Sequence, residues 1–178
     1  MQGSVSIPPV ENCPCYAKVL TMLPITAALT AEHKMFRDIF DQMERKLPGL
    51  RAATEVKELG QQLEDMLRRH AETEDDLLLM AQSADPEFKN RFAKCHRDHN
   101  EVSAEYMQLC ATQPLTKAKA LFKEGMKHTR KHIEYEERFI FPLIEKVVAP
   151  QILTRMGSIW VMNHPSFQSV TSAKYLAT

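Results

Sequence analysis

Apolar residues recur at intervals of three and four along most of this chain, which is the spacing of one face of an α-helix. The pattern divides into four long segments separated by proline and glycine. The first predicted helix follows Pro24 and stops near Pro48-Gly49, and the second runs from about Thr54 to Ser83. The third opens at Asp85-Pro86 and ends near Gln113-Pro114, and the fourth runs from about Thr116 into Val148. We expect Asp85 to cap the third helix, with Pro86 in its first turn. We expect a bend at Pro142, because proline removes a helical hydrogen bond.

Strand signals are nearly absent: no segment sustains the alternation of a β-strand, and there is no Asn-Gly or Asp-Gly turn. Four long amphipathic helices joined by short connections predict an all-α fold, an antiparallel up-down-up-down four-helix bundle. We expect an extended N-terminal arm over residues 1–24, the bundle over residues 25–148 and a C-terminal extension over residues 149–178. Within the extension, Ile152, Met156, Ile159 and Trp160 predict a short fifth helix ended by His164-Pro165.

Composition and charge exclude several classes of protein. The 178 residues are 44% hydrophobic and 26% charged, with a formal net charge of zero and no basic block. A nucleic-acid partner is therefore not expected. No apolar run approaches the roughly 20 residues of a membrane span, and the N-terminus lacks the pattern of a signal peptide. A cytoplasmic location is the expectation, with no membrane partner.

The four cysteines do not predict a disulfide framework. Cys95 and Cys110 fall on one predicted helix, where 15 residues place them about 22 Å apart, beyond the reach of a disulfide. Cys13 and Cys15 form a single Cys-Pro-Cys pair, which does not indicate a four-thiolate zinc site. Reduced thiols are expected.

One polar motif occurs twice on faces that are otherwise apolar. His70-x-x-x-Glu74 lies on the second predicted helix and His132-x-x-x-Glu136 on the fourth, and each histidine lies about 40° from its glutamate around the helix. His33 and His99 occupy the apolar faces of the first and third helices. Burying carboxylates is costly unless something positive meets them, so a metal-free structural bundle is disfavoured. Four imidazoles and two carboxylates suit two first-row transition ions, each with two histidines and with the glutamates as possible bridges.

The residues that carry this pattern resemble one known family. They are Glu32-His33, His70-x-x-x-Glu74-Asp75, Asp98-His99 and His132-x-x-x-Glu136-Glu137, followed by Phe141-Pro142. Over roughly residues 25–148 they look like the hemerythrin-like, HHE-type cation-binding domain family. The resemblance implies a four-helix bundle with a non-heme di-iron centre that meets O2. It implies six metal ligands: His33, His70, Glu74, His99, His132 and Glu136. Of these, Glu74 and Glu136 would bridge the two ions. The implied cofactor is two Fe ions, with Fe/Mn possible, that share an oxo or hydroxo bridge.

The chain departs from the hemerythrin pattern at two positions. The third helix has Cys95 where a His-x-x-x-His pair would place its first histidine, and Glu136 follows its histidine by four residues, whereas hemerythrins place an aspartate five residues on. We expect Cys95 to be a small buried thiol, with ligation of iron or oxidation as alternatives.

Neighbouring side chains have less definite roles. His128 is expected to be structural, with ligation, proton relay and support of a ligand as alternatives; His96 is expected to border a neighbouring helix, and His164 to lie on the surface. Packing is the expected role of Tyr106 and Tyr135. Asp75 and Glu137 are expected on solvated faces, with a hydrogen bond to a ligating imidazole as the alternative.

These features predict a non-heme di-iron protein that binds or reacts with O2 or a related small molecule such as NO or peroxide, or that handles iron. The alternative is a di-iron oxidase or oxygenase that acts on a small organic substrate. A carrier needs a small, dry, apolar pocket, whereas an enzyme needs a cavity that admits its substrate. The oligomeric state is left open.

Overall fold

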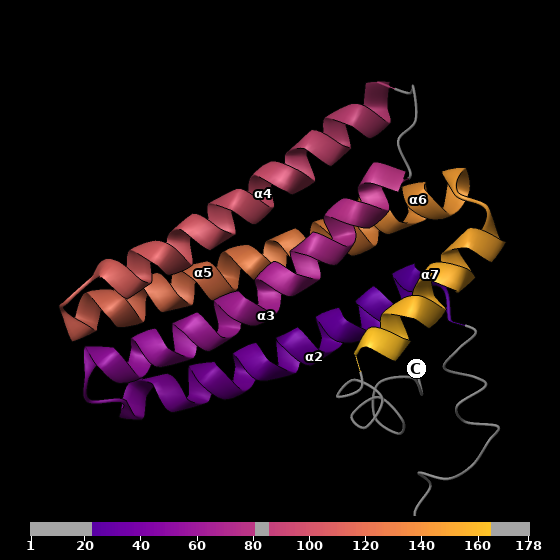
Figure 1. Ribbon diagram of the computed structural model, residues 1–178. Helices are drawn as coiled ribbons and strands as arrows, with labels where there is room; N and C mark the ends of the chain where they lie inside the picture. The colour runs from indigo at the N-terminus through magenta and orange to yellow at the C-terminus, as the bar shows by residue number, and fades with distance from the viewer. Residues whose placement is uncertain (1–22, 81–85, 165–178) are drawn as a thin grey trace, which may run out of the picture. The chain divides into compact units, whose positions relative to one another are not determined.

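The computed structural model describes residues 23–80 and 86–164, and within them every regular element is a helix (Figure 1). The elements are α2 (Ile25–Lys46), the 3₁₀ turn η2 (Leu47–Gly49), α3 (Ala53–Met80), α4 (Pro86–Ala111), α5 (Leu115–Tyr135), the π-helix η3 (Glu136–Ile140), α6 (Phe141–Val147) and α7 (Pro150–Asn163). The all-α prediction is confirmed. The predicted cap Asp85, the arm before residue 23 and the tail after residue 164 lie outside the described residues.

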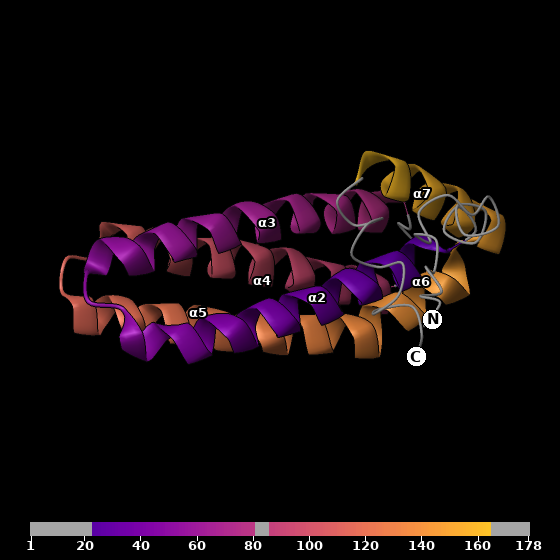
Figure 2. The same ribbon diagram turned by 90° about the horizontal axis from the view of Figure 1, so that it is seen from below.

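Two compact units make up the chain: His33–Ala149 in one, and Met1–Glu32 with Pro150–Thr178 in the other. The first unit contains the bundle. Within it the rest of α2, then α3, α4 and α5, run side by side in alternating directions (Figures 1 and 2). Short connections enforce this alternation, since α4 and α5 are separated by only three residues, 112–114.

Apolar faces of all four bundle helices meet in one core. It consists of Phe36, Phe40, Leu47, Val56, Leu63, Leu67, Val102, Tyr106, Leu109, Ala118, Phe122, Met126 and Ile133. The α2–α3 connection closes one end of this core, because the Lys119 ammonium donates to the carbonyls of Pro48 and Leu50 at 3.2 and 2.9 Å. At the start of α3 the backbone N–H groups of Arg51 and Ala52 donate to the Glu55 carboxylate at 2.8 Å, which satisfies donors that the helix leaves open.

The fourth predicted helix changes its winding before Pro142. α5 ends at Tyr135, and over Glu136–Ile140 the backbone follows π geometry, so that the N–H of Phe141 donates to the carbonyl of Glu136. Proline has no N–H, and its ring crowds the preceding turn, which favours a wider turn at this point. Just before the proline at which a bend is expected, the structure thus has a π-helical turn that contains Glu136.

The fifth helix predicted in the C-terminal extension is present as α7, and two of the residues that predict it are exposed. Leu153, Gly157, Trp160 and Val161 are buried, whereas Ile152 and Ile159 are 45% and 46% exposed. Gly157 allows close packing within this unit, because a Cβ atom there would overlap the carbonyl oxygen of Leu23. No helix in the described part of the chain is long and apolar enough to cross a membrane.

Candidate metal centre

Six polar side chains converge inside the bundle, from all four of its long helices. They are His33 on α2, His70 and Glu74 on α3, His99 on α4, His132 on α5 and Glu136 at the start of η3. None of these side chains is more than 9% exposed. The structure thus brings together all six candidate residues that the sequence singles out.

The two carboxylates lie between two pairs of imidazoles. Glu74 directs Oε1 toward the Nε2 atoms of His70 and His33, at 3.3 and 3.4 Å, and Oε2 toward Nε2 of His99, at 3.4 Å. Glu136 also lies between the two histidine pairs, but with the places of its two oxygen atoms exchanged. Its Oε2 lies 3.6 Å from Nε2 of His33, and its Oε1 lies 3.4 and 2.9 Å from Nε2 of His99 and His132. Each carboxylate therefore has one oxygen on each side, which is the arrangement of a bridging ligand.

The separations between these atoms match those of ligands around shared ions. Two ligands bound about 2.1 Å from one ion, at a right angle, lie about 3.0 Å apart. The Nε2 atoms of His33 and His70 are 2.7 Å apart, and most of the other neighbouring pairs lie at 2.9 to 3.4 Å. The atoms of His33, His70, Glu74 and Glu136 form one group that can hold an ion, and those of Cys95, His99, His132 and Glu136 form another.

Several buried atoms in this cluster make no hydrogen bond within the described residues. They are both carboxylate oxygens of Glu74, Oε2 of Glu136, and Nε2 of His99 and of His132. A buried polar atom without a partner costs about 1–3 kcal/mol, and more when it is charged. The atoms all face the centre of the cluster. Cations bound there would satisfy them together, so the residues fit a metal centre.

The outward ring nitrogens of three histidines face carboxylates. Nδ1 of His33 lies 3.1 Å from Glu137, Nδ1 of His99 lies 3.2 Å from Asp75, and Nδ1 of His132 lies 3.4 Å from Asp98. A proton held on Nδ1 by such a contact leaves the lone pair of Nε2 free for a metal.

These outer carboxylates are themselves held in place. Arg37 forms a two-point contact with Glu137, at 2.9 and 2.8 Å, and Lys94 pairs with Asp98. Burial opposes ionisation of Glu137, but His33 and Arg37 outweigh it and lower its pKa to about 2. The same balance, with His132 and Lys94 as the favourable partners, lowers the pKa of Asp98 to about 2. Both therefore remain ionised acceptors at neutral pH.

Charge within the cluster is strongly organised. Burial alone would raise the pKa of Glu74, but the imidazoles of His70, His33 and His99 hold its pKa well below the usual range. Burial would lower the pKa of His99, but Asp75, Glu136 and Glu74 outweigh it and raise its pKa to about 12. The pKa of His132 rises to about 9, because the charge of Glu136 and the contact with Asp98 exceed the effect of burial. The interior favours positive charge between its carboxylates, and metal cations supply such charge.

The geometry agrees with a comparison to known families. Residues 25–111 match the family model described as the hemerythrin HHE cation binding domain. The chain carries a hemerythrin-like domain. No curated protein and no solved structure shows a significant match to the chain. The family match covers α2, α3 and α4, so the place of His132 and Glu136 in this hemerythrin-like site rests on the geometry described above.

At Cys95, where this hemerythrin-like chain departs from the hemerythrin pattern, a sulfur atom lies beside the candidate metal centre. Cys95 is fully buried, and its Sγ lies 2.9 Å from Oε1 of Glu136, to which the thiol donates. Burial and the negative charges of Glu136 and Glu74 raise the pKa of this thiol. The predicted buried thiol is present, but it contacts a candidate ligand.

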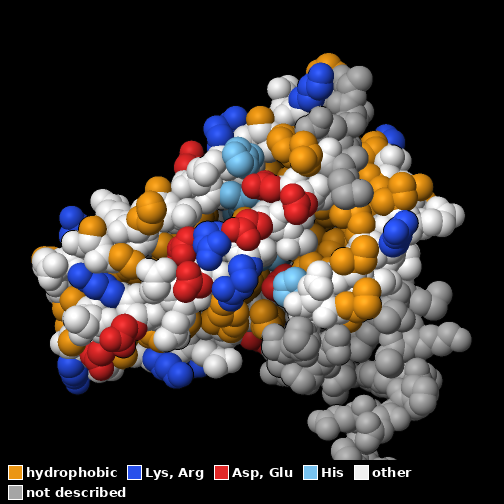
Figure 3. Space-filling view, viewed as in Figure 1, with side chains coloured by type: hydrophobic (Ala, Val, Ile, Leu, Met, Phe, Trp, Pro, Cys, Tyr) orange, Lys and Arg blue, Asp and Glu red, His pale blue; other side chains and the backbone are white. Residues whose placement is uncertain are grey.

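The other histidines lie outside the two groups. His96 is exposed, and its Nδ1 lies 3.1 Å from Asp75, so this carboxylate faces both His96 and His99. His128 pairs with Glu105 at 3.0 Å and lies near Asp98 and Glu101, so its expected structural role stays a prediction. On the face of the molecule shown in Figure 3, histidine side chains reach the surface beside acidic side chains.

Sequence reasoning did not assign Asp98 a role, although Asp98 immediately precedes His99. The available signal was its position three residues after Cys95, one helical turn along α4, which turns its side chain toward His132 on the facing helix. Asp75 and Glu137, expected mainly on solvated faces, both make the contact named as the alternative, with the imidazoles of His99 and His33.

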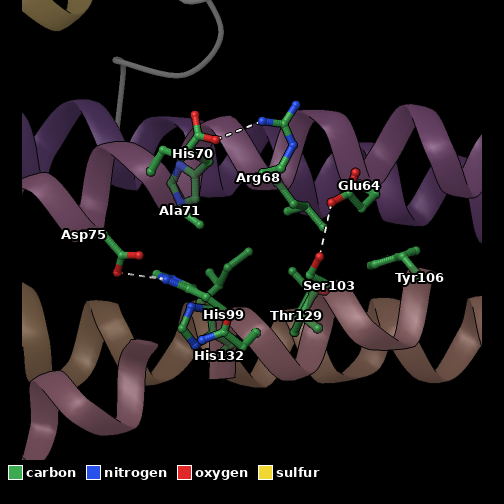
Figure 4. Close-up of a pocket in the computed structure, with 15 residues that line it drawn as sticks. Glu64, Arg68, His70, Ala71, Asp75, His99, Ser103, Tyr106, Thr129 and His132 are labelled. Atoms are coloured by element: carbon green, nitrogen blue, oxygen red, sulfur yellow. Dashed lines mark hydrogen bonds and ion pairs between the residues drawn. The ribbon is translucent and has the colours of Figure 1, made fainter. Parts of the chain in front are cut away.

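A cavity of about 230 Å³ reaches the imidazoles of His70, His99 and His132 (Figure 4). Tyr106 lies at the end of the cavity away from the histidines, with Ser103 and Thr129 between them. Leu67, Val102 and Ile133 supply buried apolar lining, whereas Arg68, Glu72 and Asn100 are exposed members of the lining. Molecules larger than a diatomic gas can therefore occupy the space beside the cluster.

Proposed function

We propose that this hemerythrin-like chain is a non-heme di-iron protein that binds or reacts with O2 or a related small molecule such as NO or peroxide. In this proposal His33 and His70 would hold one ion, His99 and His132 would hold the other, and Glu74 and Glu136 would each offer one oxygen to either ion. The observation that carries the proposal is the position of the two carboxylates, each with one oxygen toward each histidine pair.

The chemistry of the donors supports iron. Imidazole nitrogens serve iron, zinc and copper, and carboxylate oxygens add the harder donors that iron and manganese accept. Iron, when bound, would supply one-electron chemistry and open coordination positions for a small ligand. The protein's own part is to orient each Nε2 atom and to surround the centre with apolar side chains such as Phe36 and Phe141, whose rings lie 5.1 and 5.4 Å from those of His70 and His33.

The proposal is tested by reducing the iron-loaded chain without oxygen and then admitting O2. A stable adduct that vacuum removes supports reversible binding, whereas rapid irreversible oxidation of the centre supports an oxidase. If the iron-loaded protein shows no optical change with O2, NO or peroxide, the proposal fails.

A second candidate function is oxidation of a small organic substrate by the same centre. The cavity favours it, since about 230 Å³ exceeds the engineered cavity of about 150 Å³ that binds benzene. The hydroxyls of Ser103, Thr129 and Tyr106 offer groups that would orient such a molecule. We expect small aromatic or aliphatic compounds to perturb the optical spectrum of the iron-loaded protein at millimolar concentration, and a spectrum unchanged by a panel of such compounds would count against this candidate.

A further inference from the structure

The sulfur of Cys95 lies at one side of the cluster, against a single oxygen atom. Its Sγ is 2.9 Å from Oε1 of Glu136. The same oxygen lies 2.9 Å from Nε2 of His132 and 3.4 Å from Nε2 of His99. Sulfur and two imidazole nitrogens therefore surround one carboxylate oxygen.

The two imidazole nitrogens in this group provide an independent sign of a ligand. Nε2 of His99 and Nε2 of His132 are buried and make no hydrogen bond within the described residues, although the side chains are only 9% and 6% exposed. Both atoms point to the region that Cys95 faces. A buried thiol alone would indicate packing. A thiol beside two buried imidazole nitrogens that pair with carboxylate oxygens but make no hydrogen bond in the described part of the chain indicates a shared ligand.

The separations allow one ion to contact all four residues. The ligand atoms of Cys95, His99, His132 and Glu136 all lie within 4.8 Å of one another. With bonds of about 2.1 Å to nitrogen or oxygen and about 2.3 Å to sulfur, neighbouring ligands lie about 3.1 Å apart and opposite ligands about 4.4 Å apart. The observed separations therefore require only small adjustments around an ion.

We propose that Cys95 binds, as a thiolate, the ion that His99, His132 and Glu136 hold, which makes the two ions of the centre unequal. This inference rests on the proposed function, because it needs the paired site. On binding, the S–H bond breaks, a sulfur–metal bond forms and the proton leaves to solvent, with no transfer of electrons. Among the described residues, the group around His33 and His70 contains no sulfur, so Cys95 adds a thiolate to one ion of the pair.

A thiolate ligand changes which metal is preferred by the site that Cys95 shares with His99, His132 and Glu136. Thiolates favour softer ions such as Zn²⁺ over Mn²⁺, which is typically held by carboxylates and water. We expect Zn²⁺ to displace Mn²⁺ from the Cys95 side, and replacement of the sulfur by oxygen to reduce this discrimination.

X-ray absorption of the full chain, reduced and loaded with Zn²⁺ without oxygen, tests the inference. The expected spectrum contains nitrogen and oxygen at about 2.0–2.1 Å and a sulfur contribution at about 2.3 Å. Cys95→Ser and Cys95→Ala should lose the sulfur contribution and keep the nitrogen and oxygen contributions. Cys110→Ser is the matched control, because this second described cysteine on α4 contacts Gln61 at 3.6 Å, and it should keep the wild-type spectrum.

The outcomes separate the two proposals. Two bound zinc ions without sulfur in the wild-type chain would overturn the role of Cys95 and leave the paired site standing. Sulfur that persists in both Cys95 variants would assign it to another cysteine and overturn the inference. A wild-type chain that retains no ion overturns the proposed function and this inference together.

Discussion

Replacing Glu74 by alanine tests whether its carboxylate serves both proposed ions. Glu74 places one oxygen on each side of the cluster, so its loss removes a ligand atom from both ions, whereas the loss of one histidine removes a ligand from one ion. The variant should therefore bind both ions more weakly than the wild type. A matched control is Glu72→Ala, since Glu72 lies on the same helix, is 62% exposed and pairs with Arg68.

The expected magnitude follows from binding linkage. Two ions, each present at a hundredfold excess over its Kd, stabilise the fold by about 5 kcal/mol in total. For a chain of this size that corresponds to a rise in Tm of roughly 10–20 °C. If the loss of Glu74 weakens each ion at least about a hundredfold, the stabilisation at the same metal concentration falls to about 1 kcal/mol or less.

The assay is thermal unfolding of each variant with and without added metal, under anaerobic conditions for Fe²⁺. The metal-free Tm of each variant is its own reference, so that any packing defect at residue 74 cancels from the comparison. We expect a large metal-induced shift for the wild type and Glu72→Ala, and a rise of only a few degrees for Glu74→Ala. A Glu74→Ala protein that shows the full wild-type shift would refute the bridging role.

The remaining predictions concern the surroundings of the centre and the packing of α7. Glu137→Gln should weaken metal affinity about 10–100-fold in chelator competition, because it removes the carboxylate partner of His33; unchanged affinity would contradict this. Glu137 has a pKa lowered from 4.5 to about 2, so its stabilisation is present above about pH 4.5 and is lost as the pH falls toward 2; urea unfolding should show less loss on acidification in Glu137→Gln than in the wild type. Val102→Phe should fill part of the cavity, slowing reaction with organic compounds without changing metal content, and an increase in that rate would argue against the cavity as the substrate site. Gly157→Ala should lower Tm by several degrees, because its Cβ meets the backbone at Leu23, and an unchanged Tm would show that this packing yields easily.

The helices and the six central residues can be predicted from the sequence, because both depend on the spacing of residues within a single helix. A stripe of apolar residues at helical spacing identifies each buried face, and His70, Glu74, His132 and Glu136 stand out because polar residues interrupt such stripes. Short connections then restrict the helices to alternating directions. Whether these residues ligate metal remains a prediction.

Features that depend on contacts between helices were harder to obtain. The π-helical turn at Glu136 involves Pro142, but periodicity alone indicates only a bend there. The contact between Cys95 and Glu136 joins residues 41 positions apart, and the pairing of Asp98 with His132 depends on the rotation of α4 against α5. The buried face of α7 does not follow from the sequence, because this short, mostly apolar helix does not distinguish one face from another.

The iron content of the chain measures the proposed paired centre itself. The chain should be purified without chelator, reconstituted with excess Fe²⁺ without oxygen, desalted and analysed for iron and protein in the same sample. We expect two irons per chain, held between the two histidine pairs and the two carboxylates. A content of one iron per chain or less after reconstitution would contradict a paired centre.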